Sequence, residues 1–250
     1  MGKINQSSVM IFLLLPILFF GQSKQERSSY YNWFDKVIGS EHTGLFNGKQ
    51  YVNLDVNRIF EGKHAFYKSD DVLLGSLLYQ GQHYFNVEMK YNLETDMVLA
   101  ALKSGSTAYI LQLIRDNIAE FTIDGSRFVR IDGFIENNDM TNGFHEVLLE
   151  TPHFSLLKRH KKIRKKKLGN INGSIVKYEF VNANKYVLLS ERNYKRITSK
   201  TDIIKIYPGL KKEIKDFYED NKKLRKSQPD RFMQRLFEKI VEPAMSKNEI

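Results

Sequence analysis

The stretch from Leu73 to Ile131 decides the fold. It contains Gly75-Ser-Leu-Leu-Tyr79, turns at Gln80-Gly-Gln82 and continues as His83-Tyr-Phe-Asn-Val-Glu-Met-Lys-Tyr91. In the last segment apolar and polar residues alternate, which gives a strand one apolar face and one polar face. Further short apolar segments follow, separated by turns such as Asp124-Gly-Ser126. Connections this short cannot carry parallel crossovers, so the stretch predicts an antiparallel β-meander.

The sequence on either side of the meander predicts helices. Tyr30, Trp33 and further apolar residues up to Ile38 recur at helical spacing, and the single tryptophan predicts an apolar plug at one end of the sheet. From Ser199 onward the apolar residues again follow a helical period, which predicts three helices. In the last of these, Ser227 and Asp230 resemble the two ends of a capping box.

These patterns together predict a mainly β protein. The expected body is an antiparallel meander of roughly eight to eleven strands that forms a partly open barrel or a sandwich. A short N-terminal helix precedes it and three C-terminal helices follow it. Because isolated helices of this length are marginal in water, we expect the helices to bury their apolar stripes against the sheet.

The first residues predict export. Lys3 precedes an apolar run from Val9 to Phe20, and small residues follow. This is the pattern of a secretory signal peptide, with cleavage after Gly21 or Ser23. The run is shorter than the roughly 20 residues that a spanning helix needs, so we expect no transmembrane segment once the signal peptide is cleaved. Export by this route predicts a periplasmic, envelope-associated or secreted protein.

Three segments follow from these boundaries. They are residues 1–23 as signal peptide, 24–198 as an antiparallel β domain with its N-terminal helix, and 199–250 as a basic amphipathic helical segment. The chain contains no cysteine, which excludes disulfides, a lipid-anchoring cysteine, thiolate metal sites and cysteine nucleophiles. The core alone must therefore stabilise the domain.

Positive charge is in excess and is concentrated in one run. The chain has 39 Lys and Arg against 29 Asp and Glu, a net charge of +10. Between Lys158 and Lys167 eight of ten residues are permanent cations: Lys158, Arg159, Lys161, Lys162, Arg164, Lys165, Lys166 and Lys167. One interpretation is an exposed loop or edge strand that the charges protect from pairing. The other is a contact with a polyanion, to which the basic helix Lys211 to Lys226 would contribute.

The sequence offers only weak candidates for catalytic residues. His145, Glu146, Glu150 and His153 fall on two neighbouring predicted strands and could meet across the hairpin as an acid–base or metal site. Strand residues of these types more often simply face solvent. No motif for a cofactor, a nucleophile elbow or a phosphate-binding loop is present in the sequence, so we predict no cofactor and no metal.

Several short motifs carry a resemblance. They are Asn32-Trp-Phe-Asp35, Gly44-Leu-Phe-Asn-Gly48, Leu74 to Tyr84, Met89-Lys-Tyr-Asn92, Lys212 to Tyr218 and Pro229-Asp-Arg-Phe232. In this order they resemble a family of exported, uncharacterised proteins of Bacteroidota-type bacteria. The resemblance implies an envelope or secreted protein with a β-rich body and a basic helical tail, and it implies no activity or catalytic residues.

The sequence thus favours a non-enzymatic exported protein that binds or scaffolds an anionic envelope component, with an anionic glycolipid or an acidic polysaccharide as partner. Nucleic acid is disfavoured because export removes the chain from the cytoplasm and the basic run lacks aromatic residues. Two alternatives stay open: an enzyme acting on an envelope polymer, and a carrier of a small ligand in a closed β-barrel. The oligomeric state does not follow from the sequence.

Overall fold

The computed structural model describes residues 29–33, 37–55, 58–62, 64–132, 142–168, 176–190, 193–241 and 243. The predicted signal peptide, residues 1–23, lies outside them. Within the described ranges no helix is both long and apolar enough to cross a membrane.

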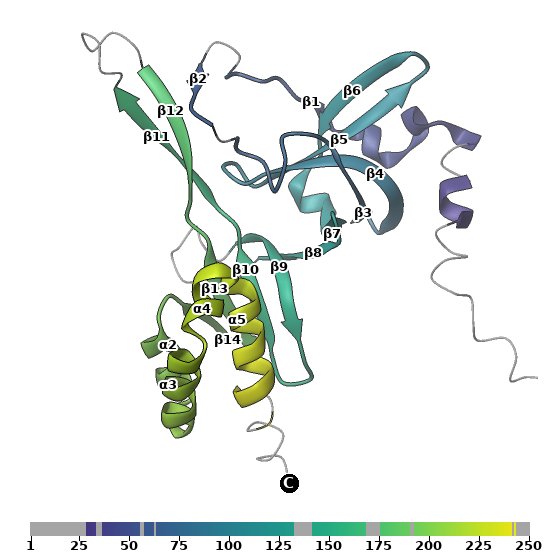
Figure 1. The fold of residues 1–250 in the computed structure, drawn as a ribbon. Helices are drawn as coiled ribbons and strands as arrows, with labels where there is room; N and C mark the ends of the chain where they lie inside the picture. Colours follow the sequence, from purple (N-terminus) through teal and green to yellow (C-terminus); the bar gives the residue numbers. More distant parts are fainter. Residues whose placement is uncertain are drawn as a thin grey trace, which may run out of the picture.

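An eleven-stranded sheet forms the body of the described chain (Figure 1). Its neighbours are antiparallel, as the short connections predict. In spatial order the strands are β1 (Lys49–Gln50), β6 (Thr107–Gln112), β5 (Met97–Ser104), β4 (Gln82–Asn92), β3 (Leu73–Tyr79), β7 (Ile118–Ile123), β8 (Ser126–Ile131), β9 (Gly143–Glu150), β10 (Ser155–Arg159), β13 (Lys185–Ser190) and β14 (Asn193–Ile197).

The sheet curls around an aromatic core. Strands β6 and β7 are consecutive in the chain, yet β5, β4 and β3 lie between them, so in a flat sheet they would be about 19 Å apart. The connection contains a 3-10 turn, η5 (Arg115–Asn117), which shortens its reach. Curling brings Tyr91 of β4 to Phe144 of β9, with ring centroids 6.0 Å apart, and Phe121 stacks on Phe128 between them at 4.8 Å.

Close strand contact accounts for one glycine of the meander. Gly75 lies at a register shift between β3 and β4. A Cβ at this position would lie 2.0 Å from the carbonyl oxygen of Thr122 on β7. Only glycine allows the two backbones to approach this closely.

A second sheet continues the first. Strands β11 (Lys162–Leu168) and β12 (Val176–Asn182) extend β10 and β13, so the four strands form one long hairpin that leaves the body as an arm (Figure 1). The short strand β2 (Ile59–Phe60) adds to β12 in parallel. In this three-stranded sheet β11 is an edge.

Helices cover one face of strands β9, β10 and β13. They are α2 (Lys200–Ile206), α3 (Lys211–Asp220), α4 (Lys222–Ser227) and α5 (Pro229–Leu236), joined by a 3-10 turn η6 (Pro208–Leu210) and followed by a π turn η7 (Phe237–Val241). Their apolar stripes bury Ile214, Phe232 and Leu236 against Leu156 and Leu188 of the sheet. The docking predicted from the helical periodicity is therefore confirmed.

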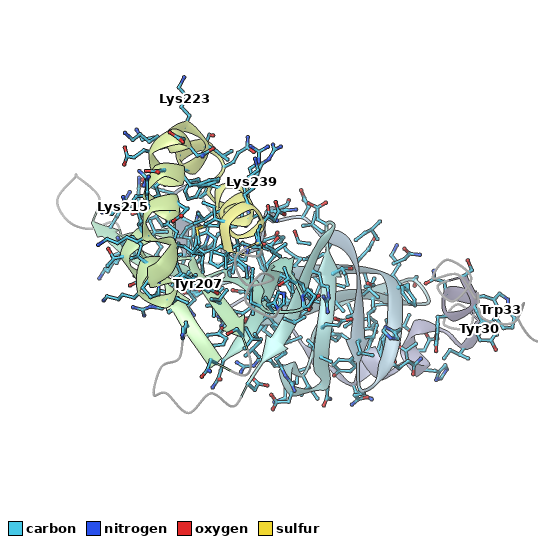
Figure 2. All side chains as sticks on the ribbon, turned by 90° about the horizontal axis from the view of Figure 1, so that it is seen from below. Tyr30, Trp33, Tyr207, Lys215, Lys223 and Lys239 are labelled. Carbon is cyan, nitrogen blue, oxygen red and sulfur yellow. The ribbon has the colours of Figure 1, made fainter. Side chains whose placement is uncertain are left out.

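The mainly β, antiparallel fold class is confirmed. The sheet is not closed into a barrel, because β1 and β14 remain as two edges, so the closed β-barrel of the carrier alternative is not present. Two further expectations need correction. Ser227 ends α4 instead of capping the last helix, and its hydroxyl donates to the carbonyl of Lys223. Trp33 is 59% exposed beside Tyr30 at the end of the molecule away from the helices (Figure 2), so it does not plug the sheet.

The helical layer predicts a large stability cost for one substitution. Leu236 is fully buried between α5 and the sheet. Replacing it with Ala leaves a cavity that the neighbouring elements fill only in part, so we expect Leu236→Ala to lower the free energy of unfolding by about 2 to 5 kcal/mol. Chemical denaturation measures this change. The exposed Lys239→Ala is the control, and equal stability of the two variants would contradict the docked position of α5.

Candidate functional site

The basic run does not form one exposed surface. Lys158 and Arg159 belong to β10, inside the main sheet, and Lys162 to Lys167 belong to β11. The side chains of Lys158 and Arg159 are only 8% and 6% exposed. The expectation of an edge strand therefore holds for the second half of the run alone. The first half is buried because β10 lies between the aromatic core and the helical layer.

The buried cations of the run each have a partner. The Lys158 ammonium lies 2.6 Å from Asp230 of α5, which also accepts from the hydroxyl of Tyr186. Arg159 donates to Asp96 at 2.7 Å and to the carbonyl of Phe144 at 2.8 Å. The run therefore connects the sheet to the helices on one side and to the β4–β5 turn on the other.

Four further cations of the run make contacts along the arm. Arg164 donates to both Asp55 and Glu94, with nitrogen–oxygen distances of 2.7 to 2.8 Å. Lys162 donates to the carbonyls of His64 and Phe66, and Lys161 to the carbonyl of Glu94. Lys167 lies 2.6 Å from Glu179.

Two cations of the run stay open to solvent. Lys165 and Lys166 are exposed, and neither lies within ion-pair distance of a carboxylate among the described residues. The helical segment adds further exposed lysines, and Lys215, Lys223 and Lys239 point away from the body (Figure 2). Acidic residues lie between them, as in the pair of Lys222 with Glu219 at 2.5 Å. The helices therefore present mixed charge.

The candidate catalytic residues do not converge. His145 is fully buried and faces Tyr194, whereas Glu146 accepts from His160 at 2.6 Å. Glu150 is exposed and pairs with Arg127 at 2.8 Å. His153 lies in the β9–β10 turn, where its backbone N–H donates to the hydroxyl of Thr151. The four side chains thus have four separate environments.

A cleft of about 440 Å³ instead gathers positive charge from several segments. We call it the basic cleft. Arg115 comes from η5, Arg159 from β10, Lys161 from the bend between β10 and β11, and Lys185 from the start of β13. Asp96 of the β4–β5 turn is the carboxylate that lines the cleft. Two members of the basic run therefore lie in a cleft with two cations that are distant in sequence.

Local backbone geometry positions Asp96. The β4–β5 turn gives it a positive φ of 60°, a conformation that Asp tolerates. Its Oδ1 accepts from Tyr91 at 2.6 Å and from Arg159. Its Oδ2 packs against Gly143, where an added Cβ would lie only 2.1 Å away. Gly143 has φ +117°, so both the space and the backbone require glycine there.

One oxygen of this carboxylate lacks a full set of partners. Asp96 is 5% exposed, and its buried Oδ2 has no hydrogen-bond partner within the described part of the chain. Arg115 is the near cation, with Nη1 3.6 Å away, and it is also 3.6 Å from Asp132. Buried carboxylate oxygens normally accept hydrogen bonds, so Oδ2 is an unsatisfied acceptor in this part of the chain, close to Arg115 and Gly143.

Burial is the largest influence on the pKa values of the groups around the cleft. Burial and the nearby Arg159 lower the pKa of His145 to about 4. Burial and repulsion from Arg196 lower the pKa of Lys185. Burial opposes the charge of Arg159, but its hydrogen bond with Asp96 raises its pKa, so the guanidinium stays charged. A desolvated site with surplus positive charge favours an anion.

The orientation of His145 follows from its partners. Nδ1 lies 3.0 Å from the carbonyl of Gly143, which can only accept, so Nδ1 carries the proton. Nε2 then accepts from the hydroxyl of Tyr194. This buried pair supports the wall of the cleft beside Arg159.

Sequence reasoning found Arg159 and Lys161 but missed Arg115, Lys185 and Asp96. Asp96 looked like an ordinary turn residue, and no spacing pattern relates the three to the run. Only the curl of the sheet and the return of the long hairpin bring them together. Within the described residues no cluster of three or more His, Asp or Glu side chains is arranged to hold a metal ion.

Comparisons of the chain with protein-family models, with curated proteins and with solved structures found no match. Function is therefore inferred from the geometry of the site.

Burial of His145 predicts a pH dependence of stability. Its pKa in the folded protein, about 4, lies below the ordinary 6.5, so the unfolded chain binds more protons between these values. The contribution is complete above about pH 6.5 and is lost as the pH falls toward 4. It amounts to about 3 kcal/mol. Urea denaturation at several pH values measures it.

A glutamine can donate to Gly143 and accept from Tyr194 without titrating, so we expect His145→Gln to flatten the stability curve between pH 6.5 and 4. The control is His153→Gln in the β9–β10 turn. Titration of the buried His160 and Glu146 remains in both variants. An equal slope for His145→Gln and the unaltered protein would contradict the buried neutral state of His145.

Proposed function

We propose that the protein is a non-enzymatic binding protein for an anionic component of the cell envelope, and that the basic cleft holds the acidic group of that component. The leader predicted at residues 1–23 would bring the chain to the compartment in which acidic polysaccharides and glycolipids occur. The shared chemistry of these partners is a carboxylate or phosphate group attached to a hydroxyl-rich sugar.

The observation that carries this proposal is the charge of the cleft. Among the described residues, four cationic side chains and the carboxylate of Asp96 line it. Asp96 offsets the charge of Arg159, and Arg115 lies 3.6 Å from both Asp96 and Asp132, but Lys161 donates to a neutral carbonyl. Within the described part of the chain, cations therefore outnumber carboxylates in the lining of the cleft. Convergent cations in a partly desolvated cleft bind anions more strongly than solvated surface lysines do.

The exposed lysines have an accessory role in this proposal. Lys165 and Lys166 on the arm and the lysines of α3 and α4 add long-range attraction to a polyanion. Such contacts are solvated and screened by salt within about 10 Å at 0.1 M, so they raise the association rate more than they select the ligand.

A pair of double variants tests the location. Arg115→Gln with Lys185→Gln removes two cations of the cleft, and Lys165→Gln with Lys166→Gln removes the same charge from the arm. Polygalacturonate is the soluble acidic polysaccharide, and vesicles with phosphatidylglycerol or lipopolysaccharide are the lipid probes. We expect the cleft variant to bind about tenfold or more weakly, because charge-assisted hydrogen bonds contribute about 1.5 to 3 kcal/mol each.

The arm variant should change affinity less and should mainly weaken its salt dependence. Binding to the polysaccharide alone would assign the acidic group to a glycan, and binding to vesicles alone would assign it to a lipid headgroup. Equal losses in the two variants would move the contact to the whole basic surface. No binding of any probe by the folded protein would refute the proposed function.

A further inference from the structure

A second cleft, of about 380 Å³, lies on the other side of the β4–β5 turn. Glu94 of this turn lines it, whereas the following residue, Thr95, lines the basic cleft. We call it the aromatic cleft because the rings of Tyr51, Phe60, Phe66 and Phe180 contribute to its walls. Its volume falls within the range that small-molecule sites occupy.

Three segments distant in sequence build this cleft. The parallel pairing of β2 with β12 places Phe60 on Phe180, with ring centroids 5.2 Å apart and ring planes within 5°. Phe66 also lines the cleft and forms an isolated antiparallel bridge with Asn92 of β4. Tyr51 is held by its backbone hydrogen bond to Ile110 of β6. The small sheet therefore has a role beyond extending the hairpin, because it supplies one aromatic wall.

Carboxylates accompany the rings, and each is already paired. Asp55 and Glu94 share Arg164, and Asp70 lies 2.9 Å from Lys90. Arg58 makes a further contact of 2.6 Å with Asp55. Three carboxylates thus meet three cations, so the cleft has no net charge from these groups. Their remaining lone pairs can still accept hydrogen bonds.

The cations also occupy the ring faces that a cationic ligand would use. Arg164 lies 5.5 Å from the ring centroids of both Phe60 and Phe180, and Lys90 lies 4.1 Å from that of Phe66. A positively charged ligand would be repelled by them. An anionic ligand would meet the three carboxylates. The cleft therefore favours a neutral molecule with an apolar face and several hydroxyl donors.

We propose that the aromatic cleft binds a neutral sugar ring. The axial C–H groups of a pyranose form an apolar face that packs on the partly negative face of an aromatic ring. Its hydroxyls donate to carboxylates and amides at the ring edge. The rings of Phe60, Phe66 and Phe180 already contact a cation and another ring. Tyr51 has no such contact among the described residues, so its ring supplies the apolar platform, and Asp70 and Glu94 lie at the border of the cleft. The inference does not depend on the basic cleft, since the lining residues of the two differ.

Ligand-observed saturation-transfer NMR with uncharged oligosaccharides tests the proposal. The probes are cellotetraose, maltotetraose and diacetylchitobiose at about 5 mM, where a complex with a Kd near 1 mM is largely formed. We expect saturation transfer to at least one probe, and no loss of signal at high salt because the probe carries no charge. Adenine is included as a neutral, flat, non-carbohydrate probe.

Matched variants locate the binding. Asp70→Asn keeps the side-chain volume at the cleft, and Asp71→Asn alters the neighbouring exposed carboxylate outside it. We expect about tenfold weaker binding for the first, as for loss of a charged hydrogen-bond acceptor, and less than twofold for the second. Tyr51→Ala removes the aromatic platform of the cleft, and Phe85→Ala removes a half-buried ring elsewhere. Circular dichroism and thermal unfolding identify any variant that fails to fold.

The outcomes separate this proposal from the proposed function. Weaker sugar binding in Asp70→Asn and Tyr51→Ala, with no effect of Arg115→Gln and Lys185→Gln, would support a sugar site in the aromatic cleft. Absence of transfer to every sugar, transfer that Asp70→Asn and Tyr51→Ala leave unchanged, or transfer to adenine alone would overturn it.

Discussion

The buried ion pair between Arg159 and Asp96 is the contact on which the arrangement of this protein depends. It joins β10 to the turn between β4 and β5. Because five strands lie between β5 and β10 in the sheet, this contact holds the curl of the sheet. Both side chains are almost fully removed from water. Such a pair is tolerated only when its remaining polar atoms are satisfied, which Tyr91 and the Phe144 carbonyl achieve in part.

The same contact determines where charge can act. The β4–β5 turn lies between the two clefts, and the long hairpin passes beside it with its cations. On one side Arg164, Arg58 and Lys90 balance Asp55, Glu94 and Asp70 in the aromatic cleft. On the other side four cations and Asp96 line the basic cleft among the described residues. Four cations of the basic run thus serve as internal counter-charges, and Arg159 and Lys161 also line the basic cleft.

Much of the fold could be predicted from local pattern. The alternation from His83 to Tyr91 and the turns at Gly81 and Gly125 predicted strands that the structure contains as β4, β7 and β8. The site was less accessible to prediction. A run of eight cations looks solvated in sequence because like charges repel, and no local pattern shows that Asp230, Asp96 and Glu94 approach from elsewhere. Trp33 shows the opposite error, since its apolar neighbours suggested a plug although it is exposed.

The sequence by itself determined the antiparallel strands, the helical C-terminal segment and the overall positive charge, because period, turn residues and composition act over a few residues. Only the tertiary structure decided that the sheet curls without closing, that four of the eight cations in the basic run pair with carboxylates from elsewhere in the chain, and that two clefts of different character flank one turn. These features depend on contacts between residues such as Arg159 and Asp96 that lie 63 positions apart. Because both charges are buried, either of them would be strongly destabilising without its partner. No local pattern in the chain encodes this pairing.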